Sequence, residues 1–267
     1  LGSLLISTIL TEEPGQVIMS LINSDFSKPI LADTDEAEVA LLFEQRNLIS
    51  APVIDENNQL VGRITIDDVV DVIRDQAEHS VMSMVGLDED EDVFAPIIQS
   101  TMRRSIWLGV NLVTAFIAVY FIGLFEATLQ QKIALAILMP VVASMGGIAG
   151  TQTLIIVTRG IATGRVTTAN IKSLINKEVA VSGLNGIIWS IVIALATYYW
   201  FSDIVLSLVI GLAIIVNLVV AAFSGAFLPL LLTKFKIDPA LAGGVILTTI
   251  TDVIGFVAFL GLASLVI

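Results

Sequence analysis

The sequence predicts an all-α membrane domain of five transmembrane helices, preceded by an α+β cytoplasmic domain and a connecting acidic helix. Of the 267 residues, 56% are hydrophobic and only 14% are charged, whereas an ordinary soluble domain has about 25% charged residues. The charges are also unevenly divided: residues 1–102 hold 20 of the 25 acidic and 4 of the 13 basic residues. An acidic, water-soluble half followed by a membrane half accounts for both observations.

The chain has no cysteine and one histidine, His79. These counts exclude a disulfide scaffold, a thiolate metal site and a histidine-rich metal site, so oxygen atoms are the expected metal ligands. Residues 1–10 lack the basic n-region and the cleavage site of a signal peptide. We interpret residues 1–14 as the remnant of a preceding domain.

Five apolar runs are long enough to cross a bilayer, which takes about 20 residues: 105–125, 133–158, 181–201, 204–232 and 239–267. The loops on one side carry eight basic residues, and the opposite loops carry only Lys132. The positive-inside rule therefore predicts a cytoplasmic acidic half and an external carboxyl terminus. Residues 159–178 are polar and basic, and we expect them to form a short amphipathic helix along the inner membrane surface.

The acidic half alternates between helical and strand patterns from residue 33 to residue 74. Apolar residues at helical spacing come first, then two short strands around the turn at residues 56–58, then a second helix. The strand at residues 51–55, Gly62 before the next strand and the following Asp67-Asp68 helix resemble a CBS domain. We assign residues 15–76 to this domain, and the resemblance implies that residues 1–14 belong to a first, paired CBS unit.

Residues 77–102 are interpreted as an acidic linker or plug helix, followed by a five-helix pore domain at residues 103–267. The linker contains five successive acids at positions 88–92, a run that is typical of a solvated segment. Alternatively, a helix that begins near this run would reach the inner membrane face, where a cation path would open.

Asp252 is the one ionisable residue deep within a predicted span. It lies 13 residues after Pro239, about 20 Å along a helix, and therefore within the hydrocarbon. A carboxylate at this depth costs a few kcal/mol unless it is paired or hydrated. Because no span offers a basic partner, the expected partner is water or a bound cation, although a protonated acid bonded between helices is the alternative. Small or hydroxylated residues lie at helical spacing from it, namely Gly244, Thr248, Thr249 and Gly255.

The second span contains Pro140 and a glycine-rich run at residues 145–152, in which Gly146 and Gly150 form a GxxxG pair. This pair indicates tight helix packing, backbone carbonyls exposed to a pore, or both. An intramembrane aspartyl hydrolase would need two deep acids that share a proton, and each chain has one.

Together, the CBS unit, the acidic linker, Arg103-Arg104 before Trp107-Leu108, the MPVVASMGG…AGTQ run and the DPALAGG…TTITDVIGF run resemble the MgtE magnesium channel family. The resemblance implies a homodimer whose central pore is lined by spans two and five and passes hydrated Mg²⁺. It also implies a pore ion site at Asp252, with Gly146, Gly147, Thr248, Gly244 and Thr249 nearby. The family's glycine run usually continues as Gly-Gly-Asn, whereas this chain has Ile148, which cannot bond to a coordinated water.

The resemblance further implies a magnesium sensor that closes the pore when cytoplasmic magnesium is high. Its metal-binding acids would be Asp67, Asp68, Asp71, Asp75 and Glu78, together with Asp88, Glu89, Asp90, Glu91 and Asp92. The excess of acids opposes close apposition of the helices until divalent cations neutralise it. A solvated helix face is the alternative interpretation, and His79 is either a further ligand or an ordinary exposed histidine.

The sequence is thus best explained by a magnesium-selective channel of the plasma membrane, not an enzyme, that its own cytoplasmic magnesium sites close. The alternatives are a divalent-cation exchanger of the same fold and a membrane-tethered magnesium sensor. The expected partners are a second copy of the chain, Mg²⁺ and membrane lipid, with no nucleic acid. The residues leave open whether Co²⁺, Ni²⁺ or Mn²⁺ also pass, and whether a nucleotide binds the CBS region.

Overall fold

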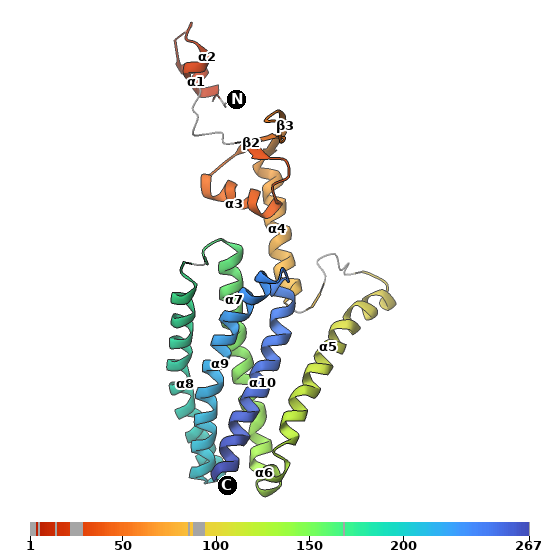
Figure 1. Cartoon of the computed structure of the whole chain (residues 1–267), viewed down its shortest axis with the longest axis vertical. Coiled ribbons are helices and arrows are strands. Elements are labelled where there is room, and N and C mark those ends of the chain that lie inside the picture. The colour runs from red at the N-terminus through yellow and green to blue at the C-terminus, as the bar shows by residue number, and fades with distance from the viewer. Residues whose placement is uncertain are drawn as a thin grey trace. The chain divides into compact units, whose positions relative to one another are not determined.

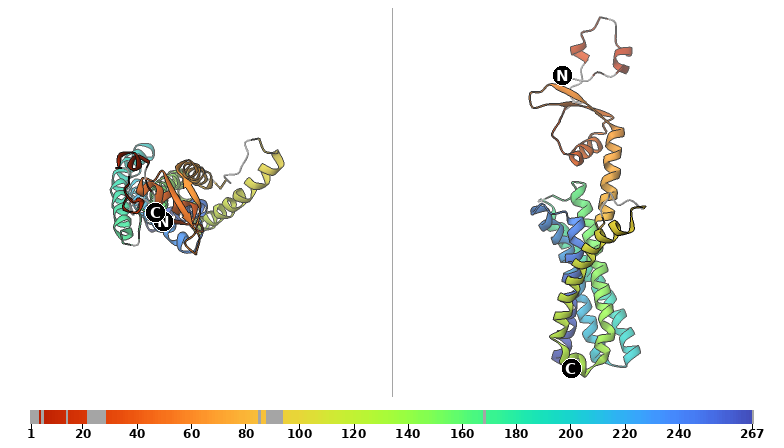
Figure 2. Two further views of the ribbon diagram at one scale, coloured as in Figure 1. Left: turned by 90° about the horizontal axis from the view of Figure 1, so that it is seen from above. Right: turned by 90° about the vertical axis from the view of Figure 1, so that its right-hand side faces the viewer.

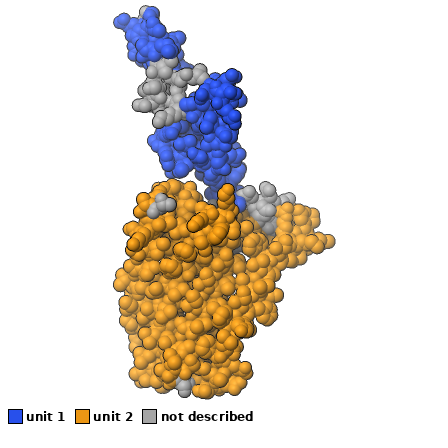
Figure 3. Space-filling view, viewed as in Figure 1, with its two compact units in different colours: residues 1–79 blue, residues 80–267 orange. Residues whose placement is uncertain are grey.

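The structure is a computed structural model that describes residues 4, 6–13, 15–21, 29–84, 86–87, 94–167 and 169–266. The chain divides into two compact units, residues 1–79 and residues 80–267 (Figure 3). The acidic run at residues 88–92 lies outside the described residues.

The first unit confirms the expected order of helix, hairpin and helix. Helix α3 (Glu36–Arg46) precedes the antiparallel strands β2 (Ser50–Ile54) and β3 (Leu60–Thr65), and helix α4 (Ile66–Ser83) follows. A third strand, β1 (Ile30–Leu31), pairs in parallel with β2. We did not predict β1, because two residues are too few for an alternating pattern to be recognised. Two short helices come earlier in the chain, α1 (Ile6–Thr11) and α2 (Ile18–Leu21).

The core of this unit lies between the helices and the sheet. Phe43 is its largest buried side chain, and it packs with Ile30, Val39, Ala40, Ala51 and Val69. The hairpin turn is fixed by Asp55, whose carboxylate accepts hydrogen bonds from the backbone N–H groups of Asn57 and Gln59 at 2.9 and 2.7 Å. Asn58 adopts a left-handed conformation with φ of 58°, which asparagine tolerates better than most residues.

The second unit contains five helices that are long and apolar enough to cross a membrane, as predicted. They are α5 (Ile97–Gly123), α7 (Ile133–Ala162), α8 (Ile171–Phe201), α9 (Ile204–Lys234) and α10 (Pro239–Val266), with the short helix α6 (Glu126–Gln131) between α5 and α7. Helix α9 is central, because α7, α8 and α10 all pack against it. Helix α5 packs mainly against α10 and diverges from the bundle toward its own amino-terminal end (Figures 1 and 2).

The expected surface helix over residues 159–178 is wrong. Helix α7 continues to Ala162, and α8 begins at Ile171 and runs without a break to Phe201. A buried stripe at four-residue spacing, Glu178, Ser182, Gly186 and Ser190, explains the difference. Because the face that packs inward already begins at Glu178, the polar segment before residue 181 belongs to the same straight helix.

The end of the bundle opposite the α7–α8 loop is fastened by an ion pair between Lys132 and Asp203. Asp203 also caps α9, since its carboxylate accepts a hydrogen bond from the backbone N–H of Leu206 at 3.0 Å. These two interactions, the backbone hydrogen bond first, hold the pKa of Asp203 below its usual range. The pair therefore joins the segment before α7 to the start of α9.

Candidate functional site

Helices α7 and α10 lie side by side in opposite directions with a regular register. A side chain added at Gly243 would meet Leu154, one at Gly150 would meet Leu247, and one at Gly255 would meet Val142, at 3.0–3.1 Å. Each step of four residues along α7 thus matches a step of four in the reverse direction along α10. Extending this register places Gly146 and Gly147 within one helical turn of Asp252.

Asp252 lies half-buried on α10. Within the described residues, no group donates a hydrogen bond to its carboxylate or forms an ion pair with it. Its neighbours Thr251 and Gly255 point to the buried side of α10. Thr248, one turn earlier, is exposed, and Gly244, two turns earlier, is half-buried. Asp252 therefore belongs to a face of α10 that the described part of its own chain leaves partly open.

The threonine hydroxyl groups of α10 donate hydrogen bonds to backbone carbonyl groups of the same helix. Thr248 donates to the carbonyl of Gly244 at 2.9 Å, and Thr249 donates to the carbonyl of Val245 at 2.8 Å. Each hydroxyl oxygen keeps lone pairs that can accept further hydrogen bonds. The water molecules of a hydrated cation are hydrogen-bond donors, so these oxygens have suitable chemistry for holding such an ion.

A cavity of about 220 Å³ lies beside this face. Thr248 and Gly244 of α10 line it together with Thr151 and Ile155 of α7, and Trp107 of α5 closes another side. The indole of Trp107 packs directly against Gly86. Trp107, which its position alone would assign to an interfacial belt, therefore contacts the segment that precedes α5. Asp252 and Thr249 do not line this cavity, and Asp252 lies one turn beyond Thr248.

Gly146 is buried against α9, where it faces Asn217. A side chain at Gly146 would overlap the Asn217 amide, and one at Gly255 would approach the same amide to 2.6 Å. Asn217 is completely buried, and its Nδ2 donates to the carbonyl of Val142 at 2.9 Å. Its Oδ1 has no hydrogen-bond partner among the described residues. Gly146 thus packs helices tightly around a buried amide.

Gly147 and Ile148 face a different way from Gly146. A side chain at Gly147 would meet nothing within 4 Å, and Ile148 is 57% exposed. Both residues lie on the part of α7 that turns away from α9. This part of α7 continues toward Thr151 and Ile155, which line the cavity beside α10.

The acids of α4 are exposed and dispersed. Asp68 accepts hydrogen bonds from the backbone N–H and the hydroxyl of Thr65, at 3.1 and 3.0 Å. Arg74 lies 3.8 Å from the carboxylate of Asp71 and 3.5 Å from that of Asp75. No three Asp, Glu or His side chains gather into a metal site in the described part of a single chain. Asp67 and Glu78 are exposed, and His79 is half-buried.

Asn217 is the residue of this region that our sequence reasoning missed. An amide carries no charge, so Asn217 is not among the ionisable residues by which the spans were judged. The sequence feature that marks Asn217 is its position as the one carboxamide within the strongly apolar stretch at residues 208–223. A buried amide must find a hydrogen-bond partner, so this position could have been singled out as a contact between helices.

Two families match the chain. Residues 139–262 match the family described as MgtE, divalent cation transporter, and residues 27–75 match the CBS domain. The first match covers α8, α9 and most of α7 and α10, and therefore includes Asp252, Gly146 and Asn217.

Three curated relatives, each named magnesium transporter MgtE, align with nearly the whole chain. The protein of Bacillus subtilis is 32% identical over 98% of this chain and 58% of its own length. That of Thermus thermophilus is 28% identical, over 100% of this chain and 59% of its own length. That of Enterococcus faecalis is 26% identical, over 99% and 58%. The chain thus spans less than two thirds of the length of these relatives.

Proposed function

This chain belongs to the MgtE family of divalent cation transporters, and we propose that it conducts Mg²⁺ through a homodimeric pore. Its membrane domain follows a CBS domain. In this proposal α7 and α10 of both copies line the pore, and one Asp252 from each copy forms the ion site. The named activity of the relatives supports Mg²⁺ as the transported ion.

The observation that carries the proposal is the Asp252 carboxylate, which lies within a membrane-spanning helix without a partner among the described residues. A second copy that faces the open side of α10 would bring two such carboxylates together. Mg²⁺ prefers oxygen ligands and gives up its water reluctantly. Two carboxylates and the acceptor oxygens of Thr248 and Thr249 suit a hydrated ion, which such a site holds firmly enough to select and loosely enough to release.

The orientation and the regulation are further parts of the proposal. The basic loops on one side of the bundle favour a cytoplasmic amino-terminal domain and an external carboxyl terminus in the plasma membrane. When cytoplasmic Mg²⁺ is high, the acids of α4 and of residues 88–92 bind it and hold the pore closed. No three acids gather within the described part of one chain, and in this proposal the bound ions draw the acids together.

The test of the pore site is Mg²⁺ uptake into proteoliposomes by the full chain and by Asp252→Asn. The variant keeps the shape of the side chain and removes its charge, so uptake should be abolished while the folded protein persists. Asp238→Asn is the matched control, since it removes one charge from the amino-terminal cap of the same helix and keeps an oxygen that can accept from Ala240. Wild-type uptake by Asp252→Asn would overturn the proposed ion site.

The time course of ion flow separates the proposed channel from its alternatives. Single-channel Mg²⁺ currents would support a channel. Slow exchange that saturates with ion concentration would instead identify a carrier of the same fold. A folded, reconstituted protein that moves no ion would leave the role of a membrane-tethered sensor.

A further inference from the structure

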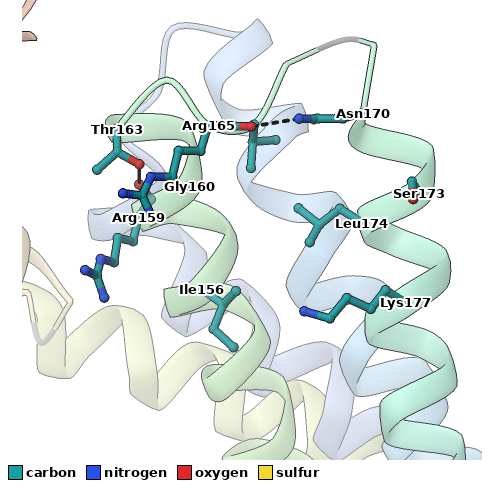
Figure 4. A pocket seen from close by; sticks show the side chains of 10 residues that line it. Ile156, Arg159, Gly160, Thr163, Arg165, Asn170, Ser173, Leu174 and Lys177 are labelled. Atoms are coloured by element: carbon teal, nitrogen blue, oxygen red, sulfur yellow. Dashed lines mark hydrogen bonds between the residues drawn. The ribbon is translucent and has the colours of Figure 1, made fainter. Parts of the chain in front are cut away.

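A second cavity lies at the carboxyl-terminal end of α7, where that helix meets the start of α8. It has a volume of about 510 Å³ and is bounded by both helices and the loop between them (Figure 4). The gap exists because α7 and α8 each pack mainly on α9 and hardly on one another. The cavity is therefore open to the surroundings of the bundle, and none of the residues assigned to the ion pathway lines it.

Three basic residues line this cavity: Arg159 from α7, Arg165 from the loop and Lys177 from α8. Figure 4 shows the Lys177 side chain directed from α8 toward α7, whereas the exposed Arg159 and Arg165 side chains extend away from α8 in this view. No described carboxylate pairs with either guanidinium group. The buried carboxylate of Glu178 lies 3.5 Å from the Lys177 amine. The three basic residues thus outnumber the one acid, and this excess of positive charge favours binding of an anion.

The loop that carries Arg165 is a folded structure and not a loose tether. The backbone N–H of Val166 donates to the carbonyl of Gly160 at 2.9 Å. Glycine suits this close return, since a side chain at position 160 would lie 2.5 Å from a methyl group of Val166. Asn170 holds both sides of the loop, donating to the carbonyl of Arg165 at 2.7 Å and accepting from the N–H of Thr167 at 2.9 Å. The backbone at Arg165 is therefore fixed at the edge of the cavity.

The depth of the cavity matches the headgroup layer of a bilayer. Arg159 lies about 39 Å along α7 from Ile133, at 1.5 Å per residue, which exceeds the roughly 30 Å of the hydrocarbon core. The lining is also amphipathic. Ile156 and Leu174 form an apolar part, while Thr163 and Ser173 offer hydroxyl groups beside the cations. A ligand with a charged group and an apolar remainder fits this lining better than a small anion does.

We propose that the cavity between α7 and α8 binds the phosphate group of an anionic phospholipid, with Arg159, Arg165 and Lys177 as its cationic ligands. Arginine is suited to this role because its planar group can donate two parallel hydrogen bonds to phosphate oxygens. Basic pockets between membrane-spanning helices are known to take anionic headgroups. The lipid would bridge α7 and α8, two helices that otherwise meet mainly through α9.

The test measures phosphatidylglycerol retained by the delipidated full chain in detergent, by native mass spectrometry. The double variant Arg159→Gln, Arg165→Gln removes two cations from exposed side chains. Loss of both cations should lower the affinity for the lipid by at least about tenfold. The matched control is Lys234→Gln, Lys236→Gln, which removes two positive charges from the end of α9 and the loop after it, outside the cavity. The control should retain the lipid like the parent.

Two further arms identify the ligand. Zwitterionic phosphatidylcholine should bind the parent at least about tenfold more weakly than phosphatidylglycerol, and inorganic phosphate should not displace the bound lipid. Equal lipid retention by the double variant and the control would overturn the proposal. Displacement by inorganic phosphate would overturn it too, because a soluble anion would then be the ligand.

Discussion

The buried amide of Asn217 predicts that alanine substitutions at two adjacent glycines of α7 have different effects on stability. In Gly146→Ala the new methyl group would overlap the Asn217 amide, which cannot retreat because Gly255 lies behind it and Val142 accepts its hydrogen bond. Overpacking of this kind costs about 1–3 kcal/mol, and loss of the hydrogen bond costs about 1 kcal/mol more. The free energy of unfolding should therefore fall by about 2–4 kcal/mol.

Gly147→Ala is the matched control, since its methyl group would meet nothing within 4 Å. Replacement of glycine by alanine within a helix is worth roughly 0.5–1 kcal/mol in favour of alanine, so this variant should be neutral or slightly more stable. The same propensity gain applies to Gly146→Ala and is outweighed there by the overlap. The adjacent substitutions should thus have opposite or clearly different effects.

The assay is thermal unfolding of the purified protein in detergent, followed by intrinsic fluorescence. With about 2–4 °C for each kcal/mol in a chain of this size, Gly146→Ala should lower the midpoint by roughly 5–15 °C. Adding Asn217→Ala makes room for the methyl group, so the double variant should be more stable than the sum of the two single changes predicts. Equal midpoints for Gly146→Ala and Gly147→Ala would refute the packing argument, as would strict additivity with Asn217→Ala.

Three further predictions concern the ends of the bundle, the pore face and the sensor. Asp203→Ala removes the cap of α9 and the partner of Lys132, so at pH 7 it should cost about 1–2 kcal/mol. The pKa of Asp203 is depressed in the folded state, so its stabilisation is present above the unfolded pKa of about 3.9 and is lost as pH falls below it. The difference in melting midpoint between parent and variant should accordingly shrink from pH 6 to pH 3. Ile148→Asn places an amide on the open part of α7, so it should raise the affinity or selectivity for Mg²⁺ over Ca²⁺ and Co²⁺ in competition uptake. Neutralising four acids of α4 to asparagine, at positions 67, 68, 71 and 75, should reduce the protection that Mg²⁺ gives residues 77–99 against protease.

Each of these predictions has a control and a contrary outcome. A stability difference for Asp203→Ala that persists unchanged at pH 3 would show that its charge contributes nothing. Identical competition profiles for Ile148→Asn and the parent would count against a pore-facing residue 148. For the sensor, Glu36, Glu38 and Glu44 of α3 provide matched acids whose neutralisation should leave the protection intact. Equal protection in the parent and in the α4 variant would indicate that these acids form only a solvated surface.

The membrane-spanning segments were predictable because their free energy depends on length and composition more than on partners. Any run of about 20 apolar residues satisfies its backbone hydrogen bonds as a helix and places its side chains in hydrocarbon. The hairpin of the first unit was predictable for a similarly local reason, since alternation and the turn at residues 56–58 involve near neighbours only. The error at the start of α8 was of another kind. Polarity near Glu178 indicated a surface segment, whereas the buried stripe that continues into Ser182 makes it part of the span.

The sequence by itself determined that Asp252 is the deep acid of this protein and that no basic residue of the spans can pair with it. Depth along a helix and the absence of a residue type can both be read from a linear chain. Only the tertiary structure decided which glycine of the Gly146-Gly147 pair packs and which stays open, because the answer depends on Asn217, 71 residues after Gly146. The same holds for the cationic cavity, where Arg159, Arg165 and Lys177 share one space because α7 and α8 both pack against α9. Contacts between helices are set by which faces meet, and a one-dimensional pattern specifies the faces but not their partners.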